Sequence, residues 1–367
     1  MRSFSRQMLF RTALKTVVRR VSLFRITLWL FLLPSITFGQ SPKGNVERAL
    51  VLPESPKPVS VLASFHLSGI NEIDSQKESF QASGTLTLTW NDPRQAFDPT
   101  VSGMAVKVYQ GGYQFNEIAP AWYPQVILAN EFGGYEKRGT ILRIYPDGTN
   151  TLTESVSATA RADFNLRHLP FDKQTLELEF QLFGFSGTEI SFGTTEPAVT
   201  ADRDRIRVPQ WEFLDVQSQI GVAPSDRNGA PSFVVHISVA RQPLFMLRTI
   251  ILPLIFCVFL CMSVFWMEPT HLGDRMNVSC FGILTSIAYL IVISDLLPQV
   301  SEVTLTHAFL NGSLLMMLGT AIVNLVVSTW EKQQRPGRWL DVTCRWLFPS
   351  IYLGLIGAAI LYFGILT

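Results

Sequence analysis

The chain has 367 residues, a formal net charge of +1 and 47% hydrophobic residues. Its polar part contains no basic block, which argues against nucleic acid as a partner. Hydrophobic residues are concentrated after Thr249, so we expect two domains with a boundary near Arg241.

The first 40 residues have the order of a secretory signal. Arg19, Arg20 and Arg25 precede the uncharged run 26–39, which ends before a short polar stretch. This order predicts a cleaved signal peptide over residues 1–40, and the alternative is an uncleaved N-terminal anchor. The sequence therefore predicts that the following domain lies outside the cytoplasm.

Residues 41–243 have the pattern of an extracellular ligand-binding domain built only from strands. Polar and apolar residues alternate over 84–90, 140–145 and 175–182, and turn residues separate these runs. The pattern predicts an all-β, immunoglobulin-like sandwich of about ten strands. The five histidines lack metal-ligand spacing and no phosphate loop or nucleophile elbow occurs, so we expect no enzyme, cofactor or metal site. All four cysteines fall in later apolar segments, where we expect them to pack.

Residues 244–367 contain four apolar runs that are long enough to cross a bilayer. The connection 331–345 carries several Lys and Arg residues, whereas 294–307 carries neither. The positive-inside rule places the connection 331–345 in the cytoplasm and the connection 294–307 outside, in agreement with an exported N-terminal domain. The predicted multi-pass domain has four helices, at about 247–267, 275–297, 305–330 and 343–366.

The second run is polar for a helix that faces only lipid, and an aspartate lies just beyond each end of it. This pattern favours a helix that lines a water-filled path for cations. Its polar members are Asn277, Ser279, Gly282, Thr285 and Ser286, and the flanking acids are Asp274 and Asp295.

A series of motifs resembles the Cys-loop, or pentameric ligand-gated ion channel, superfamily, and runs in order from about Val59 to Thr367. Thr175 occupies a position that is cysteine in animal members, and this departure is typical of bacterial members. The motifs are Trp90-Asn91-Asp92-Pro93-Arg94, Trp122-Tyr123-Pro124 with Asn130, Pro146-Asp147-Gly148, Leu169-Pro170-Phe171-Asp172-Lys173-Gln174, Arg241, Pro253 and Pro298.

The resemblance implies that the second helix lines a central pore of five identical subunits. Asp274 would form an inner acidic ring that attracts cations, and Leu284 the apolar gate. Gly273-Asp274-Arg275 lacks the inserted residue of anion-selective relatives, which favours cations. Phe281 either makes a second apolar gate or packs between subunits on a rotated helix. The stripe recurs every 3.5 residues: Asp274, Asn277, Phe281, Leu284, Ala288, Ile291 and Asp295.

Coupling residues follow from the same resemblance. A hairpin tip at 74–78 and the family's signature loop at 170–174 would both press on the connection 297–305 after the second helix. Arg241, at the domain junction, would pair with Asp172 or Glu78. The implied coupling residues are Asp74, Glu78, Pro170, Phe171, Asp172, Arg241 and Pro298.

The implied agonist site lies between subunits and is poor in aromatic residues. An aromatic cage for a quaternary amine is therefore disfavoured. The candidate agonists are then a proton, a divalent cation or a polar small molecule. The candidate residues are Thr85, Ala129, Glu131, Phe183, Phe185, Asp226 and Arg227.

Together these patterns predict a homopentameric, cation-selective, ligand-gated channel in the inner membrane. Its expected partners are its own copies, membrane lipid, monovalent cations and a small-molecule or ionic agonist. One alternative is a non-conducting membrane receptor of the same fold. A second, a membrane-anchored enzyme with a β-sandwich domain, has no supporting residues.

Overall fold

A computed structural model describes residues 51–53, 58–111, 122–222, 230–268, 272–294, 304–333 and 337–366. The chain divides into two compact units, Met1–Val51 and Leu52–Thr367, and the second contains every element described below. The predicted signal peptide lies outside the described residues, and so do Asp226, Arg227, Asp295 and Pro298.

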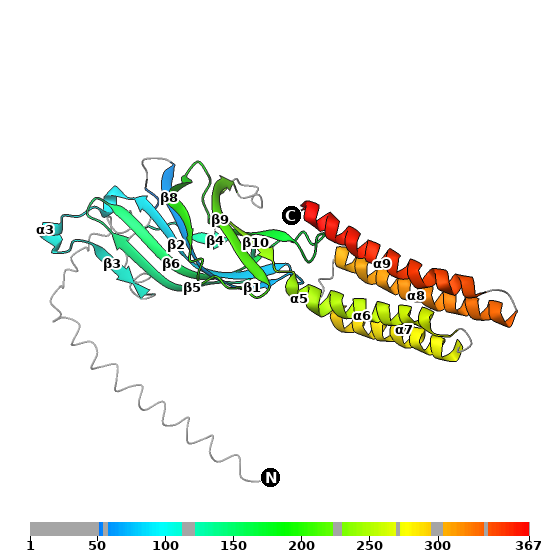
Figure 1. Ribbon diagram of the computed structural model, residues 1–367. Helices are drawn as coiled ribbons and strands as arrows, with labels where there is room; N and C mark the ends of the chain where they lie inside the picture. Colours follow the sequence, from blue (N-terminus) through cyan, green and yellow to red (C-terminus); the bar gives the residue numbers. More distant parts are fainter. Residues whose placement is uncertain are drawn as a thin grey trace, which may run out of the picture. The chain divides into compact units, whose positions relative to one another are not determined.

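In the described part of the chain, ten strands form two sheets, which confirms the predicted all-β sandwich (Figure 1). The larger sheet has the order β3-β5-β6-β2-β1-β8, and the smaller sheet has the order β4-β7-β10-β9. The strands are β1 (Val59–Asp74), β2 (Ser79–Asn91), β3 (Lys107–Gln110), β4 (Val126–Leu128), β5 (Glu131–Ile144), β6 (Thr149–Arg161), β7 (Lys173–Leu182), β8 (Ile190–Ala201), β9 (Trp211–Val222) and β10 (Pro231–Arg241).

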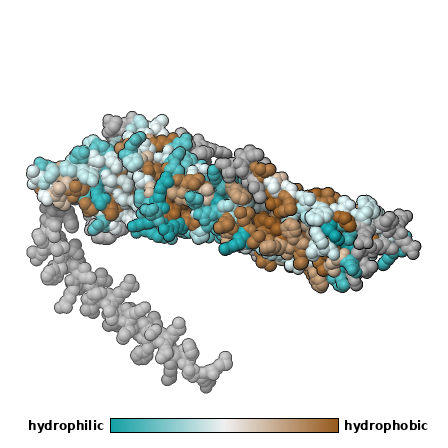
Figure 2. Space-filling view, in the orientation of Figure 1, coloured by the Kyte–Doolittle hydropathy of each residue, from teal (hydrophilic) through white to brown (hydrophobic). Residues whose placement is uncertain are grey.

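The core of the sandwich comes from the alternation seen in the sequence. Every second residue of β2 and β7 is buried, because successive side chains of a strand point to opposite faces. Phe65 of β1 meets Phe180 of β7 with ring centroids 5.3 Å apart, which joins the two sheets. Figure 2 shows a largely hydrophilic outer surface over the strands, as this alternation requires.

Two of the recognised motifs form one contact at the end of β2. The Asp92 carboxylate is buried and accepts hydrogen bonds from the Nε and Nη2 atoms of Arg94, both at 2.8 Å. Asp92 also donates its backbone N–H to the Gly148 carbonyl at 2.9 Å. Gly148 has φ +82°, and an added Cβ would lie 2.7 Å from the Asp92 carbonyl oxygen, so only glycine fits there.

The C-terminal part of the chain is helical, and Figure 2 shows that its surface is mostly hydrophobic. Three helical segments in the described part of the chain are long and apolar enough to cross a membrane: Leu244–Trp266, Gly273–Ile293 and Leu305–Trp330. The fourth predicted span is a 29-residue helix, but not all of its side chains are described, so its crossing stays a prediction. The elements are α5 (Leu244–Met246), a π-helical turn (Leu247–Ile251), α6 (Leu252–Met262), a 3-10 turn (Ser263–Trp266), α7 (Leu272–Ser294), α8 (Leu305–Lys332) and α9 (Arg338–Leu366).

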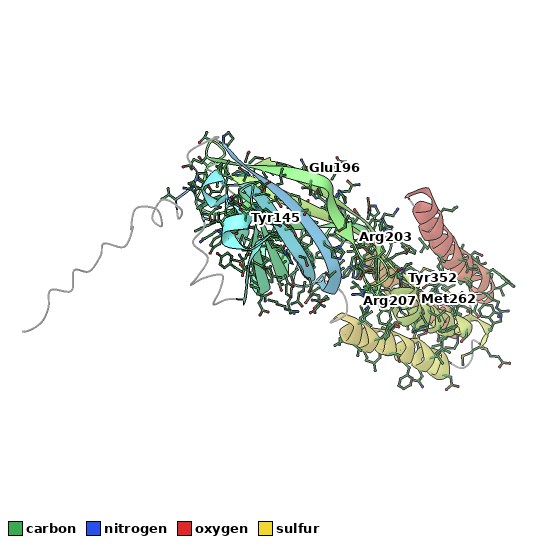
Figure 3. The ribbon with its side chains drawn as sticks, turned by 90° about the vertical axis from the view of Figure 1, so that its left-hand side faces the viewer. Tyr145, Glu196, Arg203, Arg207, Met262 and Tyr352 are labelled. Atoms are coloured by element: carbon green, nitrogen blue, oxygen red, sulfur yellow. The ribbon has the colours of Figure 1, made fainter. Side chains whose placement is uncertain are left out.

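The helices share a second hydrophobic core. Met262 of α6 and Tyr352 of α9, labelled in Figure 3, are both buried in it. The Tyr352 hydroxyl lies 3.0 Å from the Ser313 hydroxyl of α8, so the one polar atom of this ring is satisfied inside the bundle. The ring therefore links α8 and α9 while it packs against α6.

Candidate functional site

One face of α7 carries the stripe predicted to line the pore. All six described members of the stripe are exposed in the single chain. Phe281 is 66% exposed, Leu284 63% and Ile291 69%, which is far more than packing inside one subunit would leave. The six are Asp274, Asn277, Phe281, Leu284, Ala288 and Ile291.

The Phe281 ring is therefore mostly uncovered by its own subunit. Its exposure fits both predicted positions, a second ring in the pore and a contact between subunits, and excludes burial within the bundle of one chain. Ile287, which lies off the stripe, is also 45% exposed, so the exposed surface of α7 is wider than the stripe.

The opposite face of α7 corrects the interpretation of its polar residues. Ser279, Gly282 and Ser286 are buried, so they do not lie beside a water-filled path. Ser279 Oγ accepts a hydrogen bond of 3.0 Å from the Asn324 amide of α8, and Ser286 Oγ donates to Met317 Sδ at 3.4 Å. The two serines fix α7 against α8, because small hydroxylic side chains let membrane helices approach closely and form hydrogen bonds.

Gly282 sets the approach of α7 to α6. A Cβ at this position would lie 2.1 Å from Cys261 Sγ, and the next atom, Cys261 Cβ, would lie 3.8 Å away. Since Cys261 is fully buried, its thiol has little room to move aside. The glycine is thus needed for close packing rather than for backbone freedom.

Gly282→Ala is expected to destabilise the membrane domain by about 1–3 kcal/mol, the usual effect of overpacking. Adding Cys261→Ala removes the clashing sulfur and should restore most of the loss. Thermal unfolding in detergent checks both variants against Cys261→Ala alone. If the double variant is no more stable than Gly282→Ala, the clash is not the cause.

A buried ion pair joins the last residue of β10 to the signature loop. Arg241 donates from Nε to Asp172 Oδ1 at 2.8 Å and from Nη2 to Asp172 Oδ2 at 3.3 Å. The two side chains are only 5% and 1% exposed. The Arg241 guanidinium also lies 4.1 Å from the centre of the Trp211 ring, and it donates to Ser75 Oγ at 3.0 Å. The structure thus selects Asp172, of the two predicted acids, as the partner of Arg241.

The signature loop also contacts the helices directly. The Leu169 carbonyl accepts a hydrogen bond of 2.9 Å from Thr306 Oγ1, near the start of α8. Leu166 and Leu169 are buried in the hydrophobic core of the helices together with Met246. Pro170 is buried and Phe171 half-buried in the same loop. The loop is thus held by Arg241 on one side and by α8 on the other, and its coupling role stays a prediction.

The predicted hairpin tip at 74–78 is a turn built on Asp74. Its carboxylate accepts the backbone N–H groups of Gln76 and Lys77, both at 3.0 Å, and pairs with Lys77 Nζ at 2.9 Å. Glu78 is exposed, and its carbonyl accepts the Ala162 N–H at 2.9 Å. Ser75, which no sequence pattern singled out, is the residue of this turn that reaches Arg241.

The predicted agonist residues lie in different parts of the sandwich. Thr85 is half-buried in the larger sheet, and Phe183 follows the smaller sheet with its ring 58% exposed. The Phe185 ring packs edge-on against the core residue Trp122, with centroids 6.0 Å apart. Ala129 and Glu131 flank Asn130, whose side chain bonds the Glu177 carbonyl at 2.7 Å. These contacts show how each residue is held in the sandwich, and the agonist site itself stays a prediction.

Two glutamates beside these residues were missed by sequence reasoning. Glu177 lies 3.2 Å from His236 Nδ1, and Glu179 Oε1 is buried with no hydrogen-bond partner among the described residues. Burial and then the Glu177 carboxylate raise the pKa of Glu179 above its ordinary value. The alternation of β7 placed both acids on one face, but only the structure shows that Glu177 is exposed whereas Glu179 is half-buried.

Comparisons with known proteins bear on the whole chain. A sequence model of the neurotransmitter-gated ion-channel ligand binding domain matches residues 48–242. A proton-gated ion channel of Gloeobacter violaceus is 26% identical over 319 residues, which cover 85% of this chain and 86% of the relative.

Two animal receptor subunits are similar over a shorter stretch. The acetylcholine receptor subunit beta-like 1 of Drosophila melanogaster is 24% identical over 74% of this chain and 51% of its own length. The acetylcholine receptor subunit beta of Rattus norvegicus is 23% identical over 73% of this chain and 56% of its own length. The chain thus spans about half the length of these two subunits.

Proposed function

Since the chain belongs to the neurotransmitter-gated ion-channel family, whose ligand-binding-domain model matches more than half of it, we propose that five copies form a cation-selective channel opened by a ligand outside the membrane. Membership of this family identifies the chain as a ligand-gated membrane channel rather than an enzyme, and its N-terminal domain as extracellular or periplasmic. Our proposal adds three points to this family assignment: the five subunits are identical, the channel prefers cations, and its ligand acts from outside the membrane.

The observation that carries this proposal is the two-sided character of α7. Its exposed stripe begins with the carboxylate of Asp274 and the amide of Asn277 and continues with apolar side chains. The residues Ser279, Gly282 and Ser286 are buried against α6 and α8. Because this polar face of α7 is packed against its own bundle, the exposed face is the one that can contact other copies of the chain, lipid or water. Five such faces around an axis would place a ring of carboxylates at one end of an apolar path, and such a ring concentrates cations.

Asp274→Ala is expected to lower the preference for cations over anions several-fold, because it removes five negative charges from the inner end of the path. The measurement is the reversal potential in a potassium chloride gradient, recorded from purified channels in planar bilayers. Asp274→Glu keeps the charge and should keep the preference. An unchanged reversal potential in Asp274→Ala channels would reject the role of this ring.

Acid is the first agonist to apply. One similar protein is a proton-gated channel, and burial followed by the Glu177 carboxylate raises the pKa of Glu179 above its ordinary value, so that this carboxyl group binds a proton at a higher pH than an exposed glutamate does. Among the predicted agonist residues only Phe183 and Phe185 supply rings, which are too few for a cage around a quaternary amine, so polar small molecules and divalent cations come next in the screen. Currents under stepwise acidification, with and without Glu179→Gln, test the proton directly.

A non-conducting receptor is the second candidate, and the exposure of Phe281 favours it. Five phenylalanine rings on the same face as Leu284 would narrow a central path severely. Channels with Phe281→Ser should conduct if these rings only narrow the pore. If no agonist evokes current from either the natural chain or this variant, the receptor becomes the better description.

A further inference from the structure

An ion pair is buried where α7 begins, next to the proposed acidic ring. Arg275 Nη2 lies 2.5 Å from Asp341 Oδ1 of α9, and the two side chains are only 1% and 4% exposed. The two residues are 66 positions apart in the sequence. Charges are rarely placed inside a membrane domain, since their desolvation is expensive, so a buried pair of this kind points to a role.

The helix that supplies Asp341 is held in place by a second arginine. Arg345, one turn further along α9, donates from Nε and Nη2 to the Phe265 carbonyl at 3.2 and 2.9 Å. Its guanidinium also lies 5.6 Å from the centre of the Trp266 ring. These contacts fix α9 against the end of the first span, and Asp341 is thereby presented to Arg275.

The arrangement separates two neighbouring opposite charges. Successive helical residues point about 100° apart, so Asp274 belongs to the exposed stripe while Arg275 turns into the bundle. A guanidinium without a counter-charge, this close to a ring of carboxylates, would offset much of the field by which the ring attracts cations. Asp341 supplies the counter-charge, and the pair contributes little net charge at the inner end.

We propose that Asp341 is a positioning residue for ion selection: by binding Arg275 it neutralises that cation inside the bundle, so that Arg275 does not offset the negative charge of Asp274 at the inner end of the pore. This role rests on the proposed cation channel. It assigns a function to α9, which the predicted pore does not include.

The test compares variants that differ in net charge at this pair, with the potassium-to-chloride permeability ratio as the readout. Asp341→Asn leaves the Arg275 charge without compensation and should lower the ratio several-fold. Arg275→Met combined with Asp341→Leu removes both charges, leaves neither buried alone, and should return the ratio to the value of the natural chain. Lys332→Gln is the control, since it removes an exposed cation at the end of α8.

The outcomes separate this inference from the channel itself. If the natural chain prefers cations and conducting Asp341→Asn channels keep the same ratio, the inference is wrong and the channel stands. If the natural chain shows no cation preference, both are wrong. If Asp341→Asn does not assemble, Arg275→Met decides: the inference expects a ratio at least as high as that of the natural chain, and a lower ratio would overturn it.

Discussion

Arg241→Gln is expected to abolish ligand-evoked current and to destabilise the protein by about 3–5 kcal/mol, the usual effect of removing one partner of a buried ion pair. The Asp172 carboxylate would stay buried, with the Gln174 amide at 2.7 Å as its remaining side-chain partner. The contacts with Trp211 and Ser75 would be lost as well. Thermal unfolding in detergent and agonist-evoked currents give the two measurements.

Arg203→Gln is the matched control. Arg203 pairs with Asp215 at 3.3 Å, but these side chains are 65% and 48% exposed, so the loss of this pair should leave the stability of the protein nearly unchanged. Arg241→Lys keeps a positive charge but loses the forked geometry and the flat face of the guanidinium. Its stability and its evoked current should therefore lie between those of Arg241→Gln and Arg203→Gln. If Arg241→Gln is as stable and as active as Arg203→Gln, the junction does not depend on this pair.

The sandwich and the helices could be predicted because each follows from a simple period. The alternation in 84–90 and 175–182 reappears as the buried faces of β2 and β7. The apolar runs reappear as helices, with the observed bounds of α7 and α8 within a few residues of those expected. Local pattern was sufficient here because hydrophobic burial decides both kinds of element.

Composition could not predict which polar residues of α7 face inward. Ser279, Gly282 and Ser286 follow one another at spacings of three and four, and the exposed stripe has the same spacing. The buried face and the exposed face of α7 therefore have the same spacing in the sequence. Which of the two is buried depends on the helices that pack against α7. The contact of Gly282 with Cys261 and the bond from Asn324 to Ser279 come from other helices, which the period of α7 does not reveal.

The coupling junction was predictable in part. The resemblance offered two acids for Arg241, and the structure selects Asp172. Trp211 and Ser75 were missed, because each lies in another strand or turn and neither carries a signal of its own. The contact between Arg275 and Asp341 was not predicted for the same reason, because the two residues lie on different helices, with α8 between them in the sequence.

Leu284→Ser is expected to open the channel without agonist. Leu284 is 63% exposed on the stripe, where five copies would make a narrow apolar ring that excludes water. If each leucine contributes on the order of 1 kcal/mol to the shut state through apolar contact, five serines would raise the open-to-shut ratio roughly a thousandfold or more. Single-channel recording of the unliganded open probability gives the measurement.

Ile287→Ser is the control for Leu284→Ser, since it makes the same kind of change at an exposed position of α7 off the stripe. Ile287 is 45% exposed and should face a neighbouring subunit or lipid, so its replacement should leave the unliganded open probability low. If Ile287→Ser opens the channel and Leu284→Ser does not, α7 is rotated from the proposed register, and the Phe281 ring then packs between subunits. If neither variant changes the open probability while Phe281→Ser raises it, the register stands and the gate lies one turn closer to Asp274.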